Sequence, residues 1–334
     1  MNETRPTSIA RLSVVDQSPV VEGGTSAQAI ANTLRLVERC ELWGYHRYWF
    51  AEHHGSASFA CAAPLTMMAA AASRTSRIRL GSGGVLVGHH QALAVAEAVR
   101  VVQALAPGRV DVGMGRAPGG DGRVVRAMEA RPDLAEDRLR EVLAYLADRR
   151  EASNDGAIVA VPDGVERPEP WMLGTSPNSA AVAARLGLPY AYGAFIDPMQ
   201  MDDALARYHR HFTPSAWCSQ PTTMVATVVI CADTQTDAER LALCSEQWFV
   251  DSFLRGRNVR FPARPTLAGV TPHEQMLVAL RRRTVVIGDA DACAEQLDRL
   301  GRRYAVQEVA VVTIVEHDED RHRSYELLAQ RMLS

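Results

Sequence analysis

The feature that most constrains the fold is an alternation of short strand-like runs with amphipathic or alanine-rich stretches, which continues along the whole chain. The strand-like runs are 12–16, 48–51, 78–86, 110–114, 171–174, 190–195, 224–231 and 308–314. The helix-like stretches are 26–43, 61–74, 91–106, 134–150, 178–187, 198–212, 235–249, 289–303 and 319–332. Because each parallel strand needs a crossover helix before the next, these eight repeats predict an α/β protein with a closed (β/α)8 barrel, the TIM-barrel fold.

Two segments interrupt this alternation. Residues 151–170 form an excursion before the fifth strand, and residues 253–274, rich in Arg, Gly and Pro, form an insertion after the seventh strand and its helix. Loops this long inside a compact fold are usually functional or disordered, so we predict that 253–274 is a lid over the active site. With both insertions, residues 1–334 are expected to form a single domain. An open doubly wound sheet is the alternative, but no G-x-G-x-x-G motif follows the first strand.

Charge and composition exclude several classes of function. A formal net charge of −3 favours neither nucleic acid nor an anionic membrane as a partner. No stretch reaches the roughly 18 apolar residues of a membrane span and no apolar leader is apparent, which indicates a cytoplasmic protein. The chain contains no lysine, so pyridoxal enzymes, Schiff-base aldolases and P-loop NTPases are excluded. The six cysteines lie far apart, which argues against a zinc ribbon or a disulfide scaffold.

The second strand ends abruptly in polar residues. Its sequence is YWFAEHH, in which Glu52, His53 and His54 follow four apolar residues. Barrel enzymes place their reacting groups at the C-terminal ends of the strands, so we predict that these three side chains lie at the catalytic rim. His89 and His90 follow the third strand and would share this rim, which makes metal binding an alternative. Adjacent residues of a strand point to opposite sides, so His53 and His54 are not expected to chelate one ion, and no metal site is predicted.

Small residues outline a flat slot beside these histidines. The third strand ends in GSGGVL, and the fourth leads into GMGRAPGGDG, where Arg116 stands among residues too small to obstruct a flat ligand. After the fifth strand, Thr175, Ser176 and Ser179 stand at the start of a helix, where hydroxyls and amides bind phosphate well. Ser176 alone could simply cap that helix. With Arg116 available from the previous strand, the pattern predicts a phosphate site.

Seven ordered segments of the chain carry a resemblance to a known family. They are LSVVDQSPVVEGGT, ELWGYHRYWFAEHH, SRIRLGSGGVLV, APGRVDVGMGRAPG, GTSPNS, VVIGDADACAEQLDRL and EVAVVTIVEHDEDRHRSYELLA. In these segments the chain resembles the bacterial luciferase-like flavin-dependent monooxygenases, and the resemblance covers the chain from about residue 12 to residue 333. The resemblance implies a (β/α)8 barrel that binds reduced flavin mononucleotide (FMNH2), supplied by a separate NAD(P)H-dependent flavin reductase. In that family oxygen adds to the flavin at C4a, and the resulting C4a-peroxyflavin oxygenates a small organic substrate.

The same resemblance implies roles for individual residues. His53 matches the catalytic histidine of the family, and Glu52 and His54 flank it. Gly83 and Gly84 match a cis non-prolyl peptide against which the isoalloxazine ring of the flavin packs.

For the phosphate of the cofactor, Arg116, Ser176 and Ser179 match the family's contacts, and 253–274 matches its mobile lid. Met114 stands near the position of a reactive cysteine in the luciferase catalytic subunit, so thiol chemistry is not expected here. The stretch His89-His90-Gln91-Ala92 differs from the Asn-His followed by Ala-Pro of close relatives. Because this stretch lies at the rim after the third strand, the substrate of those relatives is not carried over to this chain.

Two other functions fit the same fold. An F420-dependent dehydrogenase would need extra cations for the acidic tail of F420, and Arg123 and Arg126 are candidates. A non-catalytic flavin-binding protein is the other alternative, although the Glu-His-His rim argues against it. The stretches 61–74 and 91–106 are apolar over more than one face, which predicts a homodimer. The sequence does not identify the substrate. Its arginine-only, alanine-rich composition suggests a GC-rich genome, and on that basis we predict the modification of a secondary metabolite.

Overall fold

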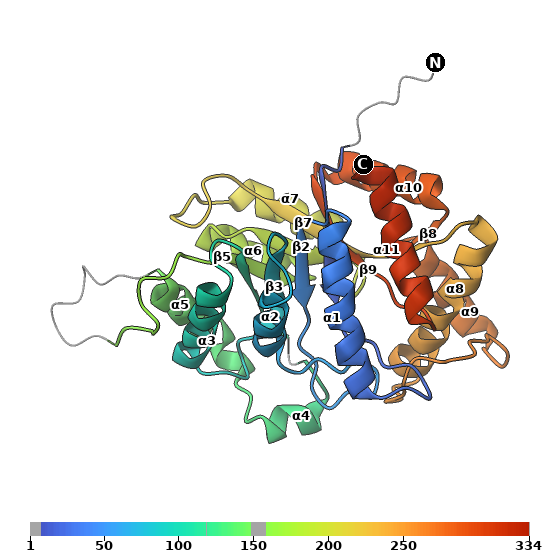
Figure 1. Cartoon of the computed structure of the whole chain (residues 1–334), viewed down its shortest axis with the longest axis horizontal. Coiled ribbons are helices and arrows are strands. Elements are labelled where there is room, and N and C mark those ends of the chain that lie inside the picture. Colours follow the sequence, from blue (N-terminus) through green and yellow to red (C-terminus); the bar gives the residue numbers. More distant parts are fainter. Residues whose placement is uncertain (1–7, 118, 148–157, 334) are drawn as a thin grey trace, which may run out of the picture.

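Eight parallel strands close into a barrel in the computed structural model, which describes residues 8–117, 119–147 and 158–333 (Figure 1). The strands are β1 (Arg11–Asp16), β2 (Arg47–Phe50), β3 (Arg79–Leu86), β4 (Val110–Gly115), β5 (Glu169–Gly174), β6 (Tyr190–Gly193), β7 (Thr223–Cys231) and β9 (Glu308–Val312). β1 pairs with β2 and β9, and β6 pairs with β7, so this ring of strands has no free edge. The predicted TIM-barrel fold is confirmed, because each predicted strand corresponds to one strand of the ring.

Helices surround the barrel in the order that the sequence predicts. They are α1 (Ser26–Leu42), α2 (Pro64–Ala72), α3 (Ala92–Leu105), α5 (Ala135–Leu146), α6 (Pro177–Leu186), α7 (Met201–His211), α8 (Gln235–Trp248), α10 (Ala290–Tyr304) and α11 (Asp318–Met332). The first and last of them, α1 and α11, lie side by side on the outside of the barrel (Figure 1). None of the helices in the described ranges has both the length and the apolar character needed to cross a membrane.

Several short elements were not predicted. They are the helices α4 (Gly122–Ala127) and α9 (Pro272–Arg282), the 3₁₀ turn η1 (Pro132–Leu134), the π-helix η3 (Phe249–Leu254) and the strand β8 (Val286–Gly288). β8 pairs with β7 outside the ring, and its three residues are too few to show a period. The start of α9 has a sequence signal that was overlooked, a capping box in which Thr271 and Glu274 satisfy each other's backbone amides.

The structure describes only part of the first predicted insertion, 151–170, but all of the second, 253–274. Within 151–170, residues 151–157 lie outside the described residues, and 158–168 contain no helix or strand before β5 begins. The segment 253–274 crosses the loops that follow β1 and β2: the backbone N–H of Phe261 donates to the carbonyl of Val20 (3.0 Å), and Asn258 accepts from the N–H of Ala57 (2.7 Å). This places 253–274 at the mouth of the barrel. Its mobility and the single-domain assignment stay predictions.

Strand β2 shows why the barrel strands are apolar on both faces. Tyr48 and Phe50 pack into the large cluster between the strands and the helices, whereas Trp49 belongs to a second cluster with Val15 and Trp171 inside the barrel. Because neighbouring residues of a strand face opposite sides, a parallel strand covered by helices is buried throughout. All four residues of β2 are buried, including its first residue, Arg47.

Five charged side chains converge at the N-terminal end of the barrel, and we call them the charged plug: Arg47, Arg79, Asp111, Glu169 and Glu308. The guanidinium of Arg47 lies 2.9 Å from Asp111 and 2.7 Å from Glu308. The indole N–H of Trp49 also donates to Asp111 (2.9 Å). The charged plug was not predicted, and it leaves the opposite, C-terminal end of the barrel as the place for a site.

Candidate functional site

A cavity of about 370 Å³ opens at the C-terminal end of the barrel strands, and we call it the rim cavity. Its size falls within the range of about 300–1,000 Å³ that is typical of ligand pockets. Of the residues predicted from the sequence, its walls contain Glu52, His53, Gly83, Gly84, Arg116, Thr175, Ser176 and Ser179. His54, predicted with them, does not line it. Residues that were not singled out also contribute, among them Gln17, Leu86, Tyr192 and Phe195.

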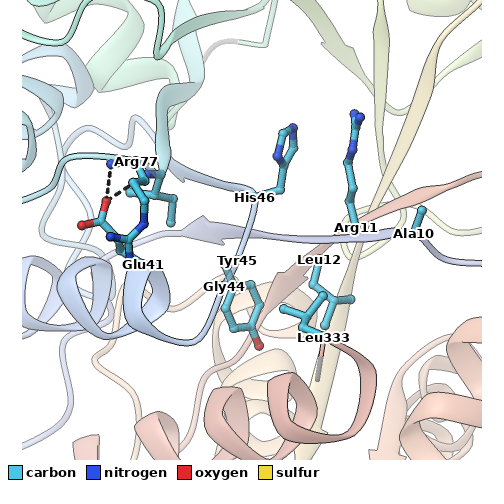
Figure 2. A pocket seen from close by; sticks show the side chains of 10 residues that line it. Ala10, Arg11, Leu12, Glu41, Gly44, Tyr45, His46, Arg77 and Leu333 are labelled. Atoms are coloured by element: carbon cyan, nitrogen blue, oxygen red, sulfur yellow. Dashed lines mark hydrogen bonds between the residues drawn. The ribbon is translucent and has the colours of Figure 1, made fainter.

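A second cavity, of about 310 Å³, lies beside the starts of β1 and β2 (Figure 2). Its lining includes Arg11, His46 and Arg77, and the carboxylate of Glu41 accepts a hydrogen bond from the backbone of Arg77 (2.7 Å). None of the predicted site residues lines this cavity. Active sites of TIM barrels lie at the opposite end, so the rim cavity is the candidate site.

His53 is held in the wall of the rim cavity as a neutral imidazole. Its backbone N–H donates to the carbonyl of Cys61 (2.9 Å), and its ring lies on that of Phe59, with 4.4 Å between centroids and 31° between planes. Nδ1 is buried and has no hydrogen-bond partner among the described residues. Burial lowers the pKa of His53 from its ordinary value to about 4. At neutral pH the ring is therefore uncharged, and one of its nitrogens carries a lone pair that can accept a hydrogen bond.

This shift predicts a pH-dependent loss of stability. Between about pH 6.5 and pH 4 the unfolded chain binds a proton on His53 that the folded chain does not, so folding weakens as the pH falls through this window. Urea unfolding of the wild type and of His53→Gln should show the wild type losing more free energy of unfolding between pH 7 and pH 4. Parallel pH dependence of the two proteins would contradict the assignment.

Glu52, a wall residue of the rim cavity, contacts His54 and His90, which do not line the cavity. Oε1 of Glu52 lies 2.7 Å from Nε2 of His54 and 2.7 Å from Nε2 of His90, and Oε2 accepts from the backbone N–H of Leu86 (2.9 Å). Burial by itself raises the pKa of Glu52, but the hydrogen bonds from His90, Leu86 and His54 outweigh it and lower that pKa below its usual value. Glu52 is therefore a carboxylate at neutral pH. We call these three side chains the Glu52 triad.

The sequence contained a signal for one pair of the Glu52 triad, Glu52 with His54, that was missed. Metal binding was considered for Glu52, His53 and His54 together with His89 and His90, and it was set aside because the adjacent His53 and His54 point to opposite sides of the strand. Residues two apart share a side of an extended chain, so Glu52 and His54 are the natural pair, and His90 joins them from beyond β3. Within the described ranges, their ligand atoms form the one group of three histidine, cysteine or acidic side chains lying within 4.8 Å of one another.

Glycines form a flat part of the wall next to His53. The peptide between Gly83 and Gly84 is cis, as the resemblance implied. A Cβ on Gly84 would lie 2.7 Å from the carbonyl oxygen of Gly113, which is backbone and has little room to move. Only glycine fits there, so the backbone itself forms the surface against which a flat ring can lie.

The far side of the rim cavity is suited to an anion. Ser176 caps α6 by accepting from the backbone N–H of Ser179 (3.3 Å), and the hydroxyl of Ser179 in turn accepts from the N–H of Ser176 (3.2 Å). The capping role proposed as an alternative for Ser176 is thus present. Arg116 lies 3.9 Å from Glu136, and its Nε is buried without a partner among the described residues. A helix N-terminus beside this guanidinium fits a phosphate.

Comparison with known proteins identifies close relatives of the whole chain. Residues 11–307 match the family model described as luciferase-like monooxygenase. The chain is 34% identical over 320 residues to a luciferase-like monooxygenase of Escherichia coli (strain K12), covering 94% of this chain and 95% of that protein. It is 32% identical over 336 residues to the N-acetyl-S-alkylcysteine monooxygenase of Bacillus subtilis (strain 168), with 97% and 98% covered. The crystal structure of apo-MsnO8 superposes with a TM-score of 0.86 at 33% identity, with 98% of each chain covered.

Proposed function

Because the chain belongs to the luciferase-like monooxygenase family, we propose that it is a flavin-dependent monooxygenase that uses reduced FMN and O2 to oxygenate an organic substrate. One observation carries this proposal. The rim cavity holds two buried nitrogen atoms without partners among the described residues, Nδ1 of His53 and Nε of Arg116. Buried polar groups are nearly always hydrogen-bonded, so both indicate a ligand that the cavity is built to hold.

The residues of the rim cavity fit the two ends of FMN. Arg116, Thr175, Ser176 and Ser179 would hold its phosphate at the start of α6, and the surface of Gly83 and Gly84 would carry the flavin ring. Bound reduced flavin would supply the electrons that activate oxygen.

The chain's own residues would then control protons and water. His53 offers a neutral imidazole as a proton acceptor at the cavity wall. Apolar side chains, among them Leu86, Leu173 and Met224, exclude water from the reacting groups and favour a largely apolar substrate.

Further parts of the proposal rest on the family and on surface composition. A separate NAD(P)H-dependent reductase would supply the reduced flavin. Homodimer formation would use α2 and α3, where Val101 and Leu105 are exposed on α3. Light scattering at micromolar concentration tests the dimer, and a monomeric mass would remove it.

Anaerobic titration with reduced FMN, followed by mixing with air-saturated buffer, tests the proposed function. The protein should bind reduced FMN and form product from a panel of N-acetyl-S-alkylcysteines, long-chain aldehydes and polycyclic compounds. Oxygen dependence separates this function from that of an F420-dependent dehydrogenase. Turnover with F420 under argon, and none with reduced FMN in air, would overturn the proposal. Arg123, one of the cations suggested for F420, pairs with Asp121 at the protein surface (2.7 Å).

Replacing Arg116 with methionine is expected to weaken reduced FMN binding about 10- to 100-fold, because a hydrogen bond to a charged group contributes about 1.5–3 kcal/mol. Riboflavin, which lacks the phosphate, should bind to the wild type and to Arg116→Met equally. Arg123→Met is the matched control and should leave FMN affinity unchanged. Equal FMN affinity of Arg116→Met and the wild type would remove Arg116 from the phosphate site.

A further inference from the structure

The Glu52 triad stands where three loops of the rim meet. Glu52 and His54 follow β2, His90 follows β3, and the backbone N–H of His54 donates to the carbonyl of Gly119 (3.3 Å) in the loop after β4. A backbone hydrogen bond also joins the loop after β3 to the loop after β4: the N–H of Arg131 donates to the carbonyl of Gly88 (2.8 Å). Hydrogen bonds to the Glu52 carboxylate, together with these two backbone hydrogen bonds, therefore link the three loops.

That carboxylate is well satisfied only while both histidines are present. Glu52 is 4% exposed, and its two oxygens face three N–H donors, from His54, His90 and Leu86. Removing one donor would leave a buried charge short of a hydrogen bond, and such a group reorients or recruits water. The donors come from different loops, so the adjustment would move the loops.

Two neighbours of the Glu52 triad belong to the wall of the rim cavity. His53 follows Glu52 directly, and Leu86 is tied to Glu52 through its backbone N–H. A displacement of Glu52 would therefore also move His53, the proposed proton acceptor, and Leu86 in the apolar part of the wall. Misplacement of a reacting group by about 1 Å can reduce a rate about 100-fold.

We infer that His90, which was not among the predicted site residues, is a positioning residue that acts through Glu52 to hold His53 and Leu86 in the wall of the rim cavity. This inference rests on the proposed function for its effect on the reaction. The geometry agrees with hydrogen bonding: both imidazoles direct Nε2 to the same oxygen at 2.7 Å, and the other oxygen is occupied by Leu86. Each imidazole then carries its proton on Nε2.

Two substitutions of His90 test whether its N–H donor to Glu52 is required. His90→Gln keeps an N–H donor that can reach Glu52, whereas His90→Ala removes it. We expect His90→Ala to reduce product formed per reduced FMN about 10-fold or more, with FMN affinity little changed and the thermal midpoint lowered, because Glu52 loses a hydrogen-bond donor. His90→Gln should stay close to the wild type. The control is His211→Gln, at the exposed end of α7.

A second measurement is independent of turnover. With ¹⁵N-labelled histidine, NMR should show hydrogen-bonded ring N–H signals for His54 and His90 in the wild type, and the His54 signal should shift in His90→Ala. Wild-type turnover in His90→Ala, or equal loss in His90→Gln, would overturn the inference. One equivalent of metal retained after purification without added ions would also overturn it, by making the Glu52 triad a metal site. A wild type that does not bind reduced FMN, but shows both ring signals, would instead refute the proposed function.

Discussion

Replacing Arg47 with leucine is expected to lower the free energy of unfolding by about 3–5 kcal/mol, because it removes a buried cation that pairs with two buried carboxylates. Arg47 is 3% exposed and lies between Asp111 and Glu308, at 2.9 and 2.7 Å. Its guanidinium also lies over the ring of Trp171, 4.8 Å from the centroid. Asp111 would keep only Arg79 and the indole of Trp49 as partners. Urea denaturation followed by tryptophan fluorescence measures the loss.

The matched control for this variant is Arg74→Leu. Arg74 pairs with Glu38 at 3.1 Å on the surface, and both side chains are exposed. An exposed pair of this kind contributes about 0–1 kcal/mol, so the control should unfold close to the wild type. If Arg47→Leu were as stable as Arg74→Leu, the charged plug would not contribute to stability as we describe.

Replacing His53 with glutamine is expected to reduce product formation by on the order of 10²- to 10⁴-fold, which is the usual contribution of a general base. Glutamine is polar but cannot accept a proton at neutral pH. The neutral imidazole on Phe59 is therefore lost while the wall of the rim cavity keeps much of its shape. Reduced FMN should still bind, because the residues proposed to hold its phosphate follow other strands.

The measurement compares product and hydrogen peroxide formed for each reduced FMN oxidised in air. In His53→Gln most of the flavin should yield peroxide in place of product. His46→Gln, beside the cavity at the other end of the barrel, is the control and should keep wild-type coupling (Figure 2). Unchanged product yield in His53→Gln, with FMN bound, would remove His53 from the reaction.

The fold could be predicted because periodicity is a local property of the sequence. Eight runs such as 48–51 and 224–231 are long enough to show the apolar character of a strand covered on both faces. β8 is too short for this, and α9 begins in a segment whose Arg, Gly and Pro content hides its capping box. Local sequence patterns therefore predict the long strands and helices. They do not predict short elements such as β8, which tertiary contacts define, or α9, whose start is marked only by its cap.

The candidate site was predictable in its location but not in its contacts. The ends of β2 to β5 indicated where Glu52, His53 and Arg116 would gather, because parallel strands end at one rim. The pairing of Glu52 with His90 joins residues 38 positions apart in the sequence, and no local pattern marks it. The low pKa of His53 arises from burial against Phe59 and its surroundings, which only the packed chain defines.

The charged plug and the rim cavity occupy opposite ends of the same strands, and this separation matters for directed evolution. In β2, Arg47 begins the strand, while Glu52 and His53 lie just beyond its end. A library that randomises rim positions such as Phe195 and Ile196 changes side chains that do not take part in the ion pairs of the plug. Such a library should yield a high fraction of folded variants. Substrate range could then be screened without first raising the melting temperature of the parent.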